Sequence, residues 1–465
     1  MEPTRTGGLP VADVPDLTGG RRRGLLVGML GVRMQLAALV LLIVGVSLEQ
    51  PAFVVAGLTV KPEHIALLAV WALVGWRLFL TGKFAKARLL FWTIALLAVL
   101  LVASVLNAPE RTESVRHTVM VALVTSAAWL TFGLINTRKA LFQAVNLLIA
   151  LACAEAILTF LVLAFAWSWI PPGAQIGAGG VAVPTGTLWE PNFLGSFLAA
   201  GAILALATLI AEVSPRRAMV RACCLSLILA GLGLSLARGA WLGLGLGLVV
   251  LLAGYALWRV RAVAFRIDSR PAQTRSNNLV LALAASVLAA LFLVALAPVV
   301  FPGTGSILIN RVNVASYDPQ ADPSLRARVD SLQDAMPGIK VHPFIGNGAG
   351  SFAVGHLDVK GNPGWISNLE FHVLYDSGLV GLACWIAGIA GLIWASGRVL
   401  TREMESQEFQ WTTLGLLAAL AALLMAFQVT EGSWLAFPWV YVGLLASAGS
   451  MRARSAGAPA EQKAA

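Results

Sequence analysis

Long apolar runs, separated by shorter polar segments, make up most of this 465-residue chain. About 20 helical residues at 1.5 Å each cross the apolar core of a bilayer. Twelve helices are predicted, at residues 30–48, 63–80, 89–107, 116–136, 142–170, 190–212, 219–237, 240–258, 278–301, 370–397, 411–430 and 435–450. The longest polar interruption, 302–365, separates the ninth helix from the tenth. The pattern predicts an all-α polytopic membrane protein with about 12 transmembrane helices.

Composition agrees with the hydrophobic pattern. Hydrophobic residues make up 58% of the chain and charged residues 12%, and the mean hydropathy is +0.80. Soluble domains carry about a quarter charged residues, so this composition places the chain in a bilayer. The recurrence of apolar runs of spanning length excludes a single anchor on a soluble domain. The first 24 residues form a polar tail that ends in three arginines and has no apolar core before a cleavage site. Membrane targeting is therefore expected to rest on the first helix.

The distribution of lysine and arginine predicts the orientation. A net charge of +10 could indicate a nucleic-acid partner, but in a polytopic protein it marks cytoplasmic loops, and we expect no nucleic-acid partner. With both termini in the cytoplasm, 24 of the 33 basic residues lie inside. The predicted parts are a cytoplasmic tail (1–29), helices one to nine (30–301), a large outer loop (302–365), helices ten to twelve (366–450) and a second cytoplasmic tail (451–465).

This orientation puts the reactive side chains on the outer face. The long loop 302–365 lies outside, and a connection of that length is usually functional. We expect it to form short helices over the membrane surface. All five histidines fall on the same side: His64, His117, His342, His356 and His372. The four cysteines show no metal-ligand spacing and are interpreted as packing residues, so no metal site is predicted.

Two arginine-containing stretches are candidates for anion binding. In LSLARGAWLGL, Arg238 lies in a tight turn between two apolar helices at the outer boundary. It snorkels to water, pairs with an acid or holds an anion. In residues 324–352, Arg328 begins a helical face that we expect to break at Pro337–Gly338. The glycine-rich turn 346–350 follows, and its backbone amides could approach an anion closely. The alternative is an ordinary surface helix followed by a flexible turn.

Two further stretches place polar groups at outer helix starts. GTLWEPNFLGSF puts Glu190 and Asn192 around a proline, which is also an ordinary way to begin a helix. In ISNLEFHVLYDSGLVG, Asn368, His372 and Asp376 recur every four residues and share one helical face. Asp376 could hold the His372 ring and leave its other nitrogen to accept a proton from a hydroxyl. The alternative is an interfacial helix whose polar face meets water.

Together these four stretches resemble the O-antigen ligase and Wzy-type polymerase family, in the family's order along residues 186–381. GTLWEPNFLGSF is similar to its G-T-x-x-x-P-N helix start and LSLARGAWLGL to its S-R-G-A turn. HPFIGNGAGSF, with Arg328 before it, is similar to its loop motif, and ISNLEFHVLYDSGLVG to its H-N-x-x-L segment. The resemblance implies a GT-C-like, metal-independent glycosyltransferase without a cofactor, acting in cell-envelope polysaccharide biosynthesis. It would face outward from the inner (cytoplasmic) membrane.

The resemblance also implies partners and roles. The donor would be a glycan on undecaprenyl diphosphate, and the acceptor a glycan, lipid or protein of the envelope, with membrane lipids around the chain. Ligase and polymerase differ only in the acceptor, and both stay open. Arg238 and Arg328 match family arginines that hold the donor diphosphate, where guanidinium groups stabilise the leaving charge.

The chain departs from the family pattern at two positions. Ala237 stands where the family has serine, and Ser367 stands where it has histidine, beside Asn368. His372 or Glu370 is therefore expected to act as base with Asp376. The expected supporting residues are Ser367, Asn368, Glu190, Asn192, His342 and His356. Alternative functions are a transporter or flippase of lipid-linked glycan, with Glu155 as the mid-helix acid, and a non-catalytic family member.

Overall fold

A computed structural model describes residues 33–49, 53–55, 58–165, 175–176, 182–264, 284–296, 323–356, 364–401, 406–432 and 434–451. The predictions for the tails 1–29 and 452–465, and for 302–322 and 357–363 of the outer loop, fall outside these residues.

Within those ranges, nine helical segments are long and apolar enough to cross a membrane. The first combines α2 (Pro62–Val70), a π-helical turn (Trp71–Gly75) and α3 (Trp76–Leu80); the others are α4 (Phe91–Leu106), α5 (Arg111–Leu134), α6 (Arg138–Phe165), α7 (Pro191–Ala211), α8 (Pro215–Leu234), α9 (Arg238–Ala264), α14 (Leu369–Leu400) and α15 (Gln407–Ala426). Three shorter apolar helices are Arg33–Gly45, Ala284–Leu296 and α16 (Ala436–Ser450). The polytopic all-α architecture is confirmed, and a helix lies at each of the twelve predicted positions. Twelve membrane crossings stay a prediction.

The centre of the bundle is formed by α7 and α15. The most apolar window of α7 is 83% buried and that of α15 72% buried, against 22% for α9. Small residues allow these helices to approach closely, as in other membrane bundles. A Cβ added to Gly415 of α15 would lie 2.5 Å from the Cβ of Ala207 on α7. The exposed apolar side chains of the outer helices, such as Leu257 of α9, suit contact with lipid.

Two short antiparallel hairpins interrupt the helices and were not predicted. Strand β1 (Phe53–Val55) pairs with β2 (Leu58–Val60), so that Phe53 lies opposite Val60. Strand β3 (Gln175–Ile176) pairs with β4 (Ala182–Val183). Both join consecutive helices and leave the helical architecture unchanged.

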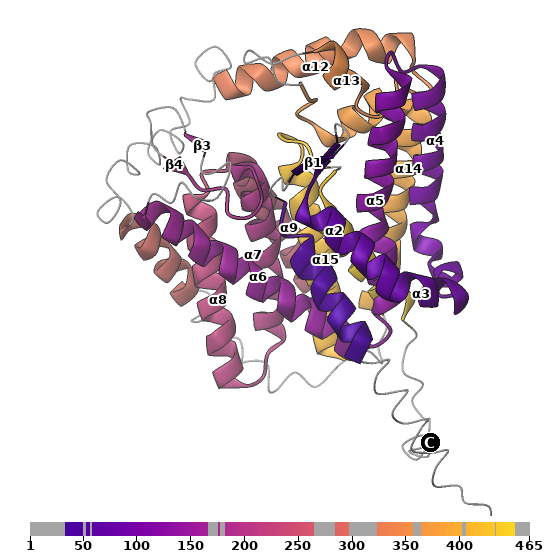
Figure 1. Ribbon diagram of the computed structural model, residues 1–465. Coiled ribbons are helices and arrows are strands. Elements are labelled where there is room, and N and C mark those ends of the chain that lie inside the picture. The colour runs from indigo at the N-terminus through magenta and orange to yellow at the C-terminus, as the bar shows by residue number, and fades with distance from the viewer. Residues whose placement is uncertain are drawn as a thin grey trace, which may run out of the picture.

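Helices α12 (Pro323–Val341) and α13 (Ser351–Gly355) lie across one end of the bundle, which we call the α12 end (Figure 1). A small cluster of Ala335, Phe352, Ile366 and Tyr375 holds them on the start of α14. The loop therefore carries helices, as expected. The predicted break at Pro337–Gly338 is wrong, because α12 continues through Pro337 to Val341. A proline removes only its own N–H from the helix, and the amide of His342 still donates to the carbonyl of Gly338 at 3.1 Å.

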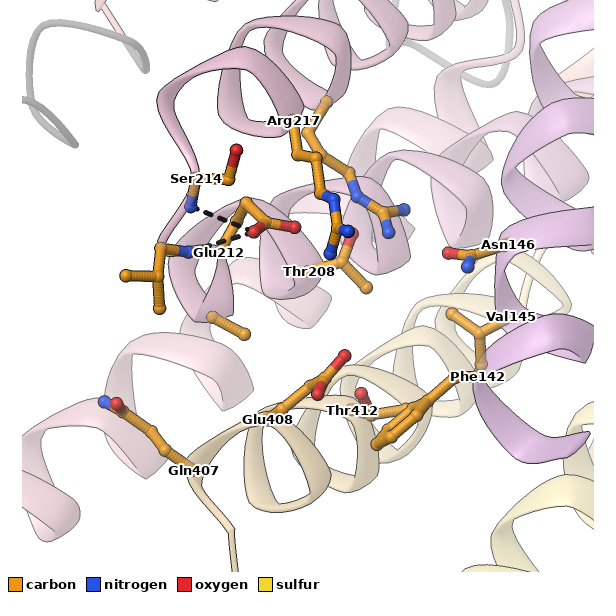
Figure 2. Close-up of a pocket in the computed structure, with 13 residues that line it drawn as sticks. Phe142, Val145, Asn146, Thr208, Glu212, Ser214, Arg217, Gln407, Glu408 and Thr412 are labelled. Atoms are coloured by element: carbon orange, nitrogen blue, oxygen red, sulfur yellow. Dashed lines mark hydrogen bonds between the residues drawn. The ribbon is translucent and has the colours of Figure 1, made fainter. Parts of the chain in front are cut away.

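A polar cavity of about 530 Å³ lies at the opposite end, among the ends of α6, α7, α8 and α15 (Figure 2). It was not anticipated from the sequence.

Candidate functional site

Helix α14 is kinked at Gly378, which has φ 64° inside an otherwise regular helix. A kink leaves amides and carbonyls without helical partners, and the segment before α13 supplies them. The amides of Leu379 and Val380 donate to the carbonyls of Pro343 (2.8 Å) and Phe344 (3.1 Å). A side chain at Gly378 would collide with the backbone of Phe344. This close backbone approach and the positive φ both require glycine here.

The glycine-rich turn 346–350 completes the same contact. The amides of Asn347 and Gly348 donate to the carbonyls of Tyr375 and Asp376, each at 2.9 Å. The amide of Gly350 lies 3.4 Å from the Asp376 carboxylate. The expectation that this turn is open to a ligand anion is wrong. Its amides are used internally, and the anion that it meets is Asp376.

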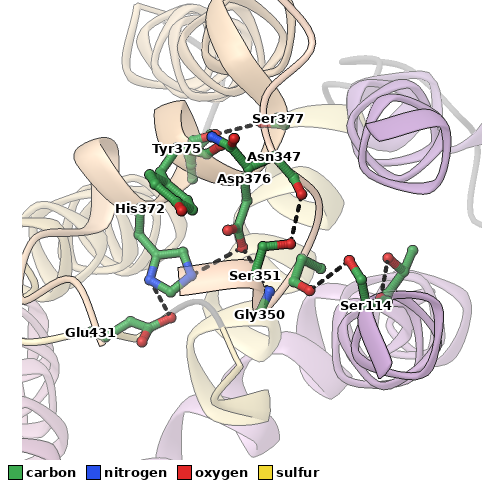
Figure 3. A network of polar contacts seen from close by, with 12 residues as sticks. Ser114, Asn347, Gly350, Ser351, His372, Tyr375, Asp376, Ser377 and Glu431 are labelled. Carbon is green, nitrogen blue, oxygen red and sulfur yellow. Dashed lines mark hydrogen bonds and ion pairs between the residues drawn. The ribbon is translucent and has the colours of Figure 1, made fainter. Parts of the chain in front are cut away.

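His372 is buried between two carboxylates (Figure 3). Its Nε2 lies 3.0 Å from Asp376 Oδ2, as the spacing predicted. Its Nδ1 lies 3.0 Å from Glu431 Oε1, and the residue is 4% exposed. The second nitrogen therefore faces a carboxylate, although this contact does not meet hydrogen-bond geometry. The expected role of His372 as a base stays a prediction.

The start of α14 is fastened to the end of α15. Asn368 caps α14 by accepting from the amide of Phe371 at 3.0 Å, and its amide group donates to the Gln428 side chain at 3.0 Å. Gln428 Nε2 also donates to Glu370 at 2.6 Å. The amide of Ser367 donates to the Ser331 hydroxyl of α12 at 3.4 Å. Ser367, Asn368 and Glu370 thus orient the helix that carries His372.

A cavity of about 480 Å³ opens at the α12 end beside this helix start. Glu431 lines it, whereas His372 and Asp376 are absent from the lining. The other lining residues are Glu49, Lys61, His64, Glu113, His117, Met120, Val121, Val124, Trp189, Glu190, Phe193, Trp365, Thr430 and Trp434. The Trp434 ring stands between two histidines, 5.3 Å from His372 and 6.1 Å from His117. The cavity combines flat aromatic rings with carboxylates and one lysine.

A buried ion cluster forms one wall of this cavity. Lys61 Nζ lies 2.5 Å from Glu49 and 3.8 Å from Glu63. Burial raises the pKa of Glu49 to about 7, although the charge of Lys61 acts in the opposite direction. Burial works to lower the pKa of Lys61, but the neighbouring carboxylates raise it above its ordinary value. The wall holds a lysine that keeps its charge at neutral pH.

Glu190 and Arg328 bring two of the predicted stretches together. Glu190 caps α7 and accepts from the Asn192 amide group at 2.8 Å. Burial raises the pKa of Glu190, while the Asn192 hydrogen bond and the charge of Arg328 act to lower it. Arg328 on α12 is thus close enough to act on a residue of the cavity wall. The residue before Glu190, Trp189, holds a left-handed backbone with φ 59°, a strained conformation typical of functional turns.

Arg238 begins α9 after a three-residue turn that follows α8. Its neighbour Gly239 lies close to Val429 and to the carbonyl of Ala426. A Cβ added at Gly239 would lie only 3.3 Å from that carbonyl oxygen. The predicted tight turn is confirmed, and it puts Arg238 beside the segment that leads from α15 to Glu431.

The remaining predicted residues lie around the site. His356 stacks on Phe352, with ring centroids 4.2 Å apart, and His342 follows the end of α12. Both belong to the layer over the cavity and are absent from its lining. The mid-helix acid Glu155 accepts hydrogen bonds from the amide and hydroxyl of Thr187, so it anchors the turn before α7.

Sequence reasoning missed Glu431, Glu49 and Lys61. They come from segments far apart in the chain, and no short motif links them to His372. One signal was present: Glu431 follows the apolar run of α15 directly, and an acid at a membrane boundary is costly unless it is used.

Fold and site together define a polytopic helical membrane protein with a cavity of ionisable and aromatic groups at one end. The O-antigen ligase family model matches residues 223–386, which include Arg238, Arg328, His372 and Asp376. This match supports assigning the chain to the O-antigen ligase family, as its motifs indicated. Glu190 and Glu431 lie outside the matched segment. No curated protein matches the chain.

Proposed function

We propose that this protein is a metal-independent membrane glycosyltransferase of GT-C-like architecture. It transfers glycan from undecaprenyl diphosphate to an envelope acceptor at the α12 end. That end faces outward from the inner membrane, and both termini lie in the cytoplasm. The observation that carries the proposal is the carboxylate–histidine–carboxylate contact at a cavity of about 480 Å³, in a chain whose family transfers lipid-linked glycans.

Arg238 and Arg328 bind the donor diphosphate. The leaving group gains negative charge as the bond between the anomeric carbon and the phosphate oxygen breaks. Guanidinium groups stabilise that charge through paired hydrogen bonds, so no metal ion is needed at this step. The action of Arg328 on Glu190 supports a position at the edge of the cavity.

Glu431 accepts the proton of the acceptor hydroxyl. The acceptor oxygen then bonds to the anomeric carbon, and the undecaprenyl diphosphate departs. His372 orients the Glu431 carboxylate through Nδ1, and Asp376 orients the His372 ring through Nε2. This base-and-orienter arrangement uses His372 as a positioning residue, with Glu370 and Asn368 fixing its helix.

Reconstitution in nanodiscs with glycan on undecaprenyl diphosphate and a panel of envelope acceptors tests the function. We expect the wild-type chain to release undecaprenyl diphosphate and to extend one of the acceptors. Release and extension should both be lost in Arg238→Ala and Arg328→Ala. Arg326→Ala is the matched control, because Arg326 lies on the same helix with a side chain that is 71% exposed.

Two results would contradict the proposal. Absence of product from the folded wild-type chain with every acceptor would contradict transfer itself. Undiminished transfer by both arginine variants would contradict the diphosphate role.

A further inference from the structure

The cavity at the end opposite α12 has the chemistry of a second binding site (Figure 2). Its volume is about 530 Å³. Four membrane-spanning helices contribute to it: Asn146 on α6, Thr208 on α7, Arg217 and Arg221 on α8, and Thr412 on α15. Figure 2 shows the Arg217 guanidinium and the Glu408 carboxylate directed into the same space. The catalytic proposal uses none of these residues.

The charges around this cavity balance in number. Two guanidinium groups, of Arg217 and Arg221, face two carboxylates, of Glu212 and Glu408. Both carboxylates are near enough to Arg221 to act on it electrostatically. The two guanidinium groups and the Glu408 carboxylate line the same space.

The arginine side of the cavity suits a phosphate. Guanidinium groups bind phosphate oxygens bidentately, and hydroxyl groups such as those of Thr208 and Thr412 add donors. Ser214, which precedes α8, also lines the cavity, so the positive end of the helix dipole adds to the attraction.

The carboxylate side suits an ammonium group. Glu212 accepts from the amides of Val213 and Ser214, each at 3.1 Å, so its position is fixed. Glu408 lies in the first turn of α15, and its side chain extends into the cavity. A ligand with only negative charge would be repelled by Glu408, whereas a zwitterion places its phosphate at the arginines and its ammonium group at Glu408.

The surroundings suit a lipid. The cavity lies at the ends of membrane-spanning helices, where headgroups reside. Val213, which lines the cavity, is 78% exposed and offers an apolar surface for an acyl chain. We propose that this cavity binds a phosphoethanolamine group, supplied by a phosphatidylethanolamine molecule of the adjoining leaflet.

Native mass spectrometry of the purified full chain, titrated with phosphatidylethanolamine, tests the proposal. Wild type should retain the lipid, and the double variant Arg217→Ala/Arg221→Ala should bind it about tenfold more weakly or worse, since two charge-assisted contacts are lost. Arg216→Ala on the same helix is the matched control, because Arg216 is exposed and does not line the cavity. Equal retention by wild type and the double variant would overturn the proposal.

Glu408→Gln separates the two halves of the site. It should weaken phosphatidylethanolamine binding severalfold while leaving phosphatidylglycerol, which lacks the ammonium group, unchanged or stronger. Wild-type binding of phosphatidylglycerol as tight as that of phosphatidylethanolamine would contradict the zwitterion assignment. Soluble glycerophosphoethanolamine distinguishes the source. If it displaces phosphatidylethanolamine only weakly, the ligand is a lipid. If it displaces the lipid at equal concentration, the cavity recognises the headgroup alone, and the proposal that the ligand is a membrane lipid is wrong. Unchanged melting temperatures establish that each variant is folded.

Discussion

Replacement of Gly378 by alanine tests the contact that holds the site together. Gly378 has φ 64° and ψ −167°, a backbone region essentially restricted to glycine, where alanine costs on the order of 1 kcal/mol or more. The added methyl group would also collide with the Phe344 backbone, so the two segments must separate. Separation breaks the hydrogen bonds from Leu379 to Pro343 and from Val380 to Phe344, each worth about 1 kcal/mol. The expected loss of stability is about 3 kcal/mol.

Melting in detergent, followed by tryptophan fluorescence, measures this loss. About 3 kcal/mol corresponds to a fall on the order of 5 °C in a large domain. Gly397→Ala is the matched control in the same helix, because an added Cβ there meets nothing within 4 Å. Alanine is the better helix former, so Gly397→Ala should melt at the same temperature or slightly higher.

The same substitution should reach the chemistry. Displacement of residues 376–380 moves Asp376 away from His372, and glycan transfer by the folded Gly378→Ala variant should fall. A Gly378→Ala protein that melts like Gly397→Ala and transfers glycan like wild type would show that the kink does not hold the site together.

Three further predictions concern the α12 end. Glu431→Gln should lower kcat for transfer by about 10²–10⁴-fold, the usual range for a general base, with little change in donor KM. The control Glu110→Gln changes an exposed acid at the start of α5 and should leave both constants unchanged. Equal kcat values for the two variants would disprove the base assignment. Burial moves the pKa of Glu49 from its ordinary 4.5 to about 7, so the folded state holds a proton more tightly than the unfolded state, and stability should fall by about 3 kcal/mol from pH 4.5 to pH 7. Chemical denaturation of Glu49→Gln should show a weaker dependence of stability on pH than wild type. Identical pH dependence in the two proteins would exclude Glu49 as the cause. Asn368→Ala removes the cap of α14, so it should cost about 1 kcal/mol of stability and reduce transfer. Ser406→Ala removes the cap of α15 at the other end of the bundle and should lower the melting temperature alone. Normal transfer by Asn368→Ala would show that this cap does not position the site.

The architecture was predictable because membrane helices are encoded locally. Length and hydropathy located each apolar helix of the described residues, with ends that agree to within about six residues, and the spacing of His372 and Asp376 predicted their contact. The turn at Arg238 was equally readable, since two apolar runs meet there with almost no connection.

The assembly of the site was not predictable, because it depends on pairing between distant segments. The turn 346–350 looked open to ligands, yet its amides bind the carbonyls that the kink at Gly378 exposes. Nothing local to either segment indicates the other. Likewise, Glu431 approaches His372 only because α15 packs beside α14 and turns back at their common end.

We propose that the α12 end binds a lipid diphosphate and transfers its glycan. The most direct test is the ratio of kcat/KM for the lipid-diphosphate donor between Arg328→Ala and Arg326→Ala, two arginine removals two residues apart on α12. We expect a loss of at least about tenfold for Arg328→Ala, since a charge-assisted contact to a phosphate is worth about 1.5–3 kcal/mol, and wild-type kinetics for Arg326→Ala. Equal kcat/KM values for the two variants would show that Arg328 does not bind the donor diphosphate.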